Sequence, residues 1–290
     1  MLFVQLLFNG IQLGALYALT AGGFALIFGA TRIFHFAHGA AFTIAGYSFY
    51  EVYANLHWPW YVALLIAAIV TVGFGVLLDR IVYTPIKRHE NSFFTLFAGA
   101  FGVGIVVQNL IAFFFGRGFV VIPTSLSKGV EVLPGVYVAP LAGVAVITAL
   151  VAFGALSAFL SRSRTGMALR ALADSPELVR AFGMSPQRFS QVAFALGSLA
   201  VVPAAILSGA NTGLSPSAGN HVMLISLAAT IVGGVGSLRG AACAGLLLGL
   251  AESLSLAWFS SEWSEAVVFI VLFLFILFRP SGFFGRALVH

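Results

Sequence analysis

The chain has 290 residues, of which 60% are hydrophobic and only 8% are charged, and its formal net charge is +5. A soluble domain carries about a quarter charged residues, so this chain cannot cover itself with a polar surface. Composition therefore argues against a soluble fold and predicts an all-α, polytopic integral membrane protein. The single cysteine, Cys243, excludes a disulfide framework within the chain.

Apolar stretches long enough to cross a bilayer recur along the whole sequence. A spanning helix needs about 20 apolar residues. The first stretch lacks a basic leader and runs too long for a signal peptide, so we expect it to be retained. We predict one transmembrane domain over residues 1–290. It has nine spans, or eight if one is re-entrant, at residues 3–30, 38–56, 60–82, 92–115, 138–160, 190–211, 221–235, 239–257 and 264–279.

The distribution of basic residues predicts the orientation. With the N-terminus outside and the C-terminus cytoplasmic, only Arg117 and Lys128 fall on the outer side, in a loop over residues 116–137. This asymmetry is typical of membrane proteins and explains the high isoelectric point without a nucleic-acid partner. The inner side then carries Arg32, Arg80, Lys87, Arg88, Arg162, Arg164, Arg170, Arg180, Arg188, Arg239, Arg279 and Arg286.

The inner loop over residues 161–189 contains two amphipathic segments, LRALAD and PELVRAFG. Ser175 is a plausible N-cap, because Pro176 follows it at the first helical position and Glu177 lies in the first turn, where its charge suits the helix dipole. Gly183 is suited to end that helix. We therefore predict two short helices lying across the inner face.

The stretch IFHFAHGAAF raises the question of a metal site, because His35 and His38 are three residues apart. A zinc site needs a third ligand, and no Asp, Glu or Cys lies nearby in the sequence, so we predict no metal there. Polar residues before Gly39 favour a helix break near the inner surface instead. Such breaks often line substrate paths.

Several other polar residues lie within or at the ends of predicted spans. Most are expected to bond to neighbouring helices, and some to line a pathway. Glu252 has two interpretations: an exposed interfacial carboxylate, or a residue that faces the bundle interior beside the path. The candidate pathway residues are His35, His38, Gly39, Gln12, Asn9, Asn109, Asn211 and Glu252.

The sequence resembles the LivH-type permease subunits of branched-chain amino acid ABC importers. The resemblance runs in order along nearly the whole chain and rests on FNGIQLGALYALTAGGFALIFGATRIFHFAHG, YTPIKR, SRTGMALRALADSPELVRAFGM, IVGGVGSLRGAACAGLLLGLAES and RPSGFFG. One departure is His35, where the family has asparagine. Another is at Leu178 and Val179, where ABC importer permeases usually carry two alanines in a loop whose Glu and Gly match Glu177 and Gly183.

The resemblance implies a permease that pairs with a second, related permease, two cytoplasmic ATPases and a periplasmic binding protein, in the bacterial inner membrane. ATP and Mg would be bound by the ATPases, and the chain itself has no Walker A motif. No cofactor is therefore expected on this chain, and no catalytic residues. The inner loop would couple to the ATPases through Arg164, Gly166, Arg170, Asp174, Pro176, Glu177 and Gly183.

Three alternatives stay open at this stage. An ion-coupled secondary transporter would need an essential charged group at mid-membrane, and a membrane enzyme would need a clustered catalytic set. Within the same family, the substrate could be urea, a short amide or another amino acid rather than leucine, isoleucine or valine.

Overall fold

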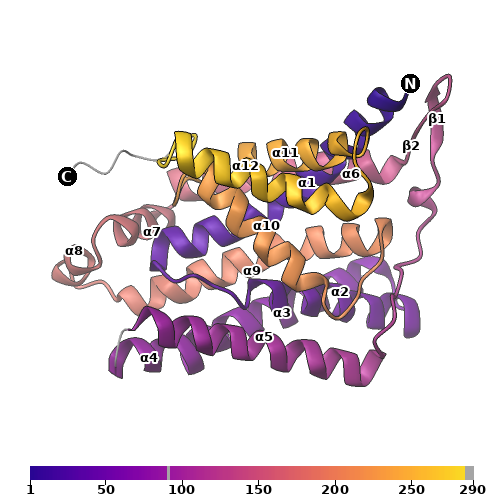
Figure 1. Ribbon diagram of the computed structural model, residues 1–290. Coiled ribbons are helices and arrows are strands. Elements are labelled where there is room, and N and C mark those ends of the chain that lie inside the picture. The colour runs from indigo at the N-terminus through magenta and orange to yellow at the C-terminus, as the bar shows by residue number, and fades with distance from the viewer. Residues whose placement is uncertain (90–91, 285–290) are drawn as a thin grey trace.

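The computed structural model describes residues 1–89 and 92–284, and Arg286 of the predicted inner charges lies outside that part. The described chain is a bundle of long helices with two short helices at one end and a small hairpin at the other (Figure 1). The long helices are α1 (Leu2–Thr31), α2 (His38–Tyr50), α3 (Trp60–Leu78), α5 (Phe93–Phe115), α6 (Pro140–Arg162), α9 (Pro186–Asn211), α10 (Ala218–Gly233), α11 (Leu238–Ser255) and α12 (Ser264–Phe278).

Each of the nine predicted spans corresponds to one of these helices. Within the described residues, seven helices are long and apolar enough to cross a membrane. One of them is α3, which continues through a π-helical turn, η2 (Asp79–Tyr83), into α4 (Thr84–His89). The other two, α2 and α10, are shorter, although α2 continues into η1 (Glu51–Asn55). Both α2 and α10 are largely buried, so they lie inside the bundle.

Helix α1 forms the centre of the bundle. In its most apolar stretch 94% of the residues are buried, against 11% for α6 at the periphery. Small residues allow α11 to pack closely against it: a Cβ on Gly249 would lie 2.3 Å from the Cα of Gly14, and one on Gly245 would lie 2.6 Å from the Cα of Ala18. Small residues of this kind let membrane helices approach closely.

The connection between α1 and α2 turns back into the bundle. Arg32 ends α1 with φ of 56°, a left-handed conformation that reverses the chain. His38, the first residue of α2, then contacts the carbonyl of Thr20, which lies about 16 Å before the end of α1. The predicted break before Gly39 is present: the chain leaves α1 at the end of that helix and turns inward, so that α2 begins deep in the bundle.

The predicted outer loop, residues 116–137, contains most of a short β-hairpin, which the all-α prediction does not include. Strands β1 (Val130–Leu133) and β2 (Val136–Val138) form an antiparallel hairpin after a 3₁₀ turn, η3 (Ser125–Ser127). The β-branched residues of VEVL and VYV favour strands, and Pro134 followed by Gly135, with φ of 77°, makes the turn. Gln5 holds the hairpin to α1 by bonding both the carbonyl and the N–H of Tyr137, at 2.7 and 2.8 Å.

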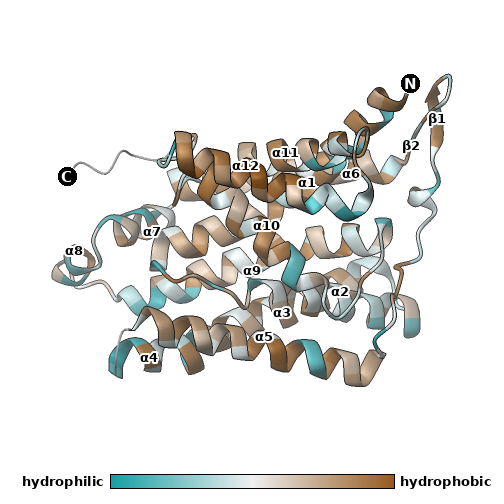
Figure 2. Ribbon diagram, in the orientation of Figure 1, coloured by the Kyte–Doolittle hydropathy of each residue, from teal (hydrophilic) through white to brown (hydrophobic). Residues whose placement is uncertain are grey.

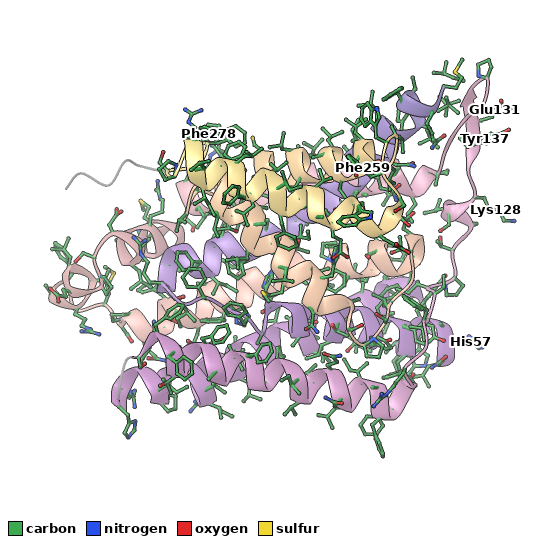
Figure 3. All side chains as sticks on the ribbon, viewed as in Figure 1. His57, Lys128, Glu131, Tyr137, Phe259 and Phe278 are labelled. Atoms are coloured by element: carbon green, nitrogen blue, oxygen red, sulfur yellow. The ribbon has the colours of Figure 1, made fainter. Side chains whose placement is uncertain are left out.

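The exposed tryptophans lie at the hairpin end of the bundle. Figure 3 labels His57, Phe259, Lys128 and Tyr137 at the hairpin end, and Phe278 at the opposite end of α12. All four tryptophans, which flank these labelled segments, are exposed: Trp58, Trp60, Trp258 and Trp263. Exposed tryptophans at one level are typical of a membrane interface.

Candidate functional site

Two short helices, α7 (Arg164–Asp174) and α8 (Pro176–Ala181), occupy the end of the bundle opposite the hairpin. The N–H of Gly166 donates to the Ser163 hydroxyl at 2.8 Å, which caps α7. The N–H of Leu178 donates to the Ser175 hydroxyl at 3.2 Å, which caps α8. The predicted helix pair, with Ser175 as its second N-cap, is confirmed.

Two glycines shape this end for different reasons. A Cβ on Gly166 would lie 2.3 Å from the backbone oxygen of Phe159, so the tight turn from α6 into α7 excludes any side chain there. Gly183 has φ of 72° and open space around it. Gly183 follows α8, and many helices end at a left-handed glycine of this kind. The prediction that Gly183 ends this helix is confirmed.

The helix pair has one buried and one exposed side. Leu169, Leu172 and Val179 pack against Ala30 of α1 and Ala193 of α9. The opposite side presents three apolar side chains that are 49–74% exposed: Met167, Leu178 and Phe182. Beside them lie exposed charged residues and one exposed proline, namely Arg164, Arg170, Asp174, Glu177, Arg180 and Pro176. The pair is thus fixed to two long helices while it presents a mixed surface outward.

Polar contacts tie the end of α1 to its neighbours at this same level. The Arg32 guanidinium donates to the carbonyl of Ala173 in α7 at 3.2 Å, and Lys87 donates to the carbonyl of Thr31 at 2.9 Å. Asp79 accepts from Ser190, in the first turns of α9, at 3.0 Å. A displacement of α7 would therefore act directly on α1 and on the segment that leads to His35.

The two histidines lie together in the interior. Nδ1 of His35 lies 2.8 Å from the Tyr83 hydroxyl, and Nε2 of His38 lies 2.9 Å from the carbonyl oxygen of Thr20. Both side chains are fully buried, with ring centroids 5.7 Å apart. Their other ring nitrogens have no hydrogen-bond partner within the described chain. In this conformation neither ring faces an open path.

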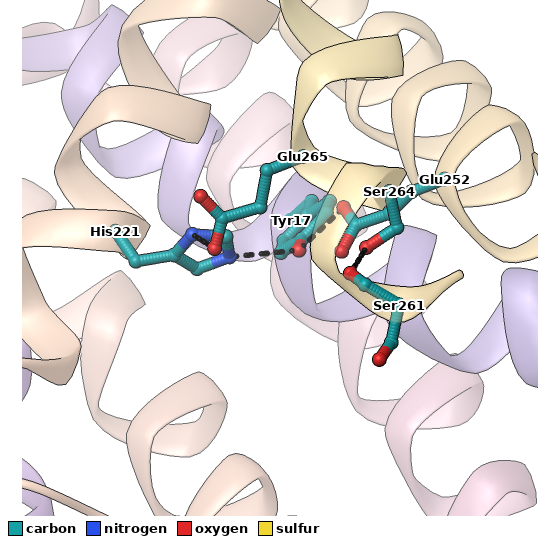
Figure 4. A network of polar contacts seen from close by, with 6 residues as sticks. All are labelled: Tyr17, His221, Glu252, Ser261, Ser264 and Glu265. Carbon is teal, nitrogen blue, oxygen red and sulfur yellow. Dashed lines mark hydrogen bonds and ion pairs between the residues drawn. The ribbon is translucent and has the colours of Figure 1, made fainter. Parts of the chain in front are cut away.

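A second polar cluster connects four helices near the hairpin end (Figure 4). The Tyr17 hydroxyl of α1 donates to Oε2 of Glu252 in α11 at 2.8 Å and lies 3.2 Å from Nε2 of His221 in α10. Nδ1 of His221 lies 2.9 Å from Oε1 of Glu265 in α12. Glu252 is buried, so of its two interpretations the structure supports the one in which it faces the bundle interior.

The predicted pathway residues do not form one site. His35, His38 and Gly39 gather at the start of α2, and Glu252 lies in the separate cluster of Figure 4. Gln12 is buried in α1, whereas the remaining three are exposed: Asn9, Asn109 and Asn211. Their roles in transport stay predictions.

Sequence reasoning missed several partners in these clusters, namely Tyr17, Tyr83, Asp79, His221 and Glu265. The signal was present for His221 and Glu265, because each is an ionisable group at the very start of a predicted span, where it must find a partner. Tyr17 and Tyr83 gave little signal, since an isolated tyrosine is common in apolar helices.

The Tyr17→Phe variant should be less stable than the wild type. It removes the hydroxyl that donates to the buried Glu252 carboxylate at 2.8 Å, and we expect a loss of roughly 1–3 kcal/mol in the free energy of unfolding. Thermal unfolding of the purified protein in detergent would measure this. Tyr61→Phe is the matched control, because Tyr61 is 59% exposed on α3, and it should unfold like the wild type.

Comparison with known proteins agrees with this architecture. The family described as branched-chain amino acid transport system / permease component matches residues 6–277. The high-affinity branched-chain amino acid transport system permease protein LivH of Escherichia coli K12 is 31% identical over 98% of this chain and 96% of its own length. The corresponding BraD of Pseudomonas aeruginosa is 32% identical over the same shares.

A solved structure shares the fold at lower identity. PsaBC from Streptococcus pneumoniae in complex with Fab superimposes with a TM-score of 0.51 and 14% identity, covering 96% of this chain and 92% of that one. The family match extends over nearly the whole chain and overlaps each of the seven membrane-length helices in the described residues. The chain therefore belongs to the family of permease components of branched-chain amino acid transport systems, as a multi-pass protein of the bacterial inner membrane.

Proposed function

We propose that this chain is one permease subunit of an ATP-driven importer that carries leucine, isoleucine and valine into the cell. It works with a second, related permease, two ATPases that bind ATP and Mg, and a periplasmic binding protein. The N-terminus and the hairpin face outward, and α7 and α8 face the cytoplasm. The full-length similarity to LivH and BraD supports the substrate class.

One observation carries the mechanism: α7 and α8 are fixed to the long helices on one side and exposed on the other. The exposed apolar side chains Met167, Leu178 and Phe182 are suited to enter a groove on an ATPase, with charged residues around them. When the ATPases close, they move α7. The Arg32–Ala173 contact and the packing on Ala30 and Ala193 pass that movement to α1 and α9.

The movement reaches the centre of the bundle through the segment after Arg32. This segment carries His35 and leads to α2, which crosses α10 with Gly39 against Gly219. A shift of α1 relative to α9 changes this crossing, and the bundle opens toward the cytoplasm. Two packings of rigid helices, rather than a continuous bend, are the usual basis of such a switch.

Reconstituted uptake tests the substrate assignment. Proteoliposomes that contain both permeases and both ATPases, together with the binding protein, should accumulate labelled leucine when ATP is supplied on the ATPase side. Excess isoleucine or valine should compete with the label, and urea or acetamide should not. Uptake of urea or acetamide in place of leucine would contradict the assignment and favour another substrate within the family.

A further inference from the structure

An apolar groove lies between α3, α6 and α9. It has a volume of about 860 Å³, and α1 forms its floor through Leu19 and Gly22. Its almost entirely apolar walls include Leu65 of α3, Leu156 of α6 and Leu199 of α9. Leu65 and Leu199 are 60% and 44% exposed, so the groove is open to the outside of the bundle. All four helices are long enough to cross a membrane, so the groove faces the hydrocarbon core.

The size of the groove favours an acyl chain over a protein segment. A helix that crosses the hydrocarbon is about 10 Å wide and 30 Å long, which amounts to roughly 2,400 Å³. The groove offers about 860 Å³. An acyl chain crosses one leaflet only, about 15 Å, and is a single carbon chain wide, so one or both chains of a phospholipid fit the groove.

Two exposed arginines lie at the end of the groove nearest α7. Arg162 is three residues after Phe159, which lines the groove, so both lie on one side of α6, about 4.5 Å apart along the helix. On α9, Arg188, Val192 and Leu196 also lie on one side, and Leu196 lines the groove about 12 Å from Arg188. Phe159 and Leu196 pack against the same buried cluster, which brings α6 and α9 together at this end.

The charges of Arg162 and Arg188 are available to a ligand. Neither arginine is paired with a carboxylate within the described part of the chain. Figure 2 shows hydrophilic residues at the α7–α8 end of the bundle and mainly apolar residues along the middle of α9. Basic side chains beside a pocket between membrane helices bind anionic lipid headgroups, because a guanidinium can donate two N–H groups to one phosphate. The arginines therefore favour an anionic headgroup, and the groove favours an apolar chain.

We propose that the groove between α3, α6 and α9 is a specific site for an anionic phospholipid. The headgroup phosphate lies at Arg162 and Arg188, and an acyl chain runs from there along α6 and α9 into the groove. The lipid belongs to the leaflet on the side of α7. That leaflet is the cytoplasmic one in the orientation of the proposed function, which is all that this inference takes from that function.

Photolabelling tests this site in the complete importer in proteoliposomes. The probe is phosphatidylglycerol with a diazirine in one acyl chain, present as a trace in a phosphatidylcholine bilayer. Irradiation, proteolysis and mass spectrometry locate the adducts. We expect them to concentrate on groove residues such as Leu156 and Leu199, and unlabelled phosphatidylglycerol should displace the probe. A phosphatidylcholine probe with the same diazirine chain should label the groove much less.

Filling the groove tests the site of the chain. Ala155 of α6 lines the groove and is exposed, so Ala155→Trp should reduce the groove adducts severalfold. Leu150→Trp is the matched control, because Leu150 is 68% exposed on the same helix and lies outside the groove. It should be labelled in the groove like the wild type.

Removing the two charges tests the site of the headgroup. Arg162→Gln combined with Arg188→Gln should lower the preference for the phosphatidylglycerol probe over the phosphatidylcholine probe roughly tenfold or more. Arg80→Gln combined with Arg239→Gln removes the same charge from two other exposed positions. This control should keep the wild-type preference.

Three results would overturn the assignment. Adducts spread over all exposed apolar residues, Leu150 included, would show an ordinary lipid layer. An absence of groove adducts would show that something other than lipid covers the groove, and equal labelling by both wild-type probes would exclude a role for the arginines. Leucine uptake is measured in the same proteoliposomes. Uptake without groove adducts contradicts only the lipid site, whereas groove adducts without ATP-driven uptake contradict the proposed function.

Discussion

Replacing Gly39 by alanine is expected to destabilise the protein strongly, although alanine is the better helix former. The added Cβ would lie 2.1 Å from the backbone oxygen of Gly219, and a Cβ on Gly219 would meet the oxygen of Gly39 at the same distance. The atoms nearest to each added Cβ are backbone atoms of the facing helix, so no flexible side chain can rotate away to make room. We expect a loss of about 3 kcal/mol or more and a lower yield of folded protein.

The matched control is Gly73→Ala on α3. Nothing lies within 4 Å of that Cβ position, so the substitution should be neutral or should stabilise the helix by up to about 1 kcal/mol. Thermal unfolding in detergent and the monodisperse fraction after solubilisation would compare the two. If Gly39→Ala and Gly73→Ala unfolded at the same temperature, the crossing of α2 and α10 would not be as close as the structure shows.

Gly183→Val is expected to separate ATP hydrolysis from transport. A β-branched residue disfavours the φ of 72° at this position by about 1–2 kcal/mol, so the end of α8 unwinds while the long helices stay intact. Because 1.4 kcal/mol corresponds to tenfold in an equilibrium constant, the intact form of α8 becomes up to tenfold less populated, and we expect leucine uptake to fall by as much as tenfold. ATP hydrolysis by the assembled importer should fall less, and the amount of membrane-inserted protein should not change.

Gly183→Asn is the control for this position, because asparagine tolerates the left-handed conformation and should keep uptake close to wild type. Glu177→Lys reverses an exposed charge in the first turn of α8 and should impair coupling without affecting insertion. Wild-type uptake in both Gly183→Val and Glu177→Lys would show that α8 is not the coupling element.

The sequence was sufficient to predict most of the helices. Hydrophobic length alone located each long helix to within a few residues, because a bilayer imposes a minimum span that few other folds require. Capping chemistry located the short pair: Ser175, Pro176 and Gly183 act through local backbone geometry, which does not depend on the rest of the fold.

What the sequence could not supply was the depth and the partners of polar residues. The return of the chain after Arg32 depends on a single left-handed residue that is not glycine, and such positions have no reliable local signal. The contact of Tyr17 with Glu252 joins residues 235 positions apart, which only the packing of α1 on α11 brings together. The hairpin over residues 130–138 was missed because the four residues VEVL are too few to show the alternation of apolar and polar residues that is typical of a strand.

Uptake under two separate energy sources is the most direct test of the central claim that partner ATPases drive this permease through α7 and α8. Proteoliposomes with the complete importer and its binding protein are given either ATP on the ATPase side or an imposed proton or sodium gradient without ATP. We predict leucine accumulation with ATP and none with either gradient. Accumulation driven by a gradient in liposomes that hold this chain without ATPases would contradict the account and identify an ion-coupled transporter instead.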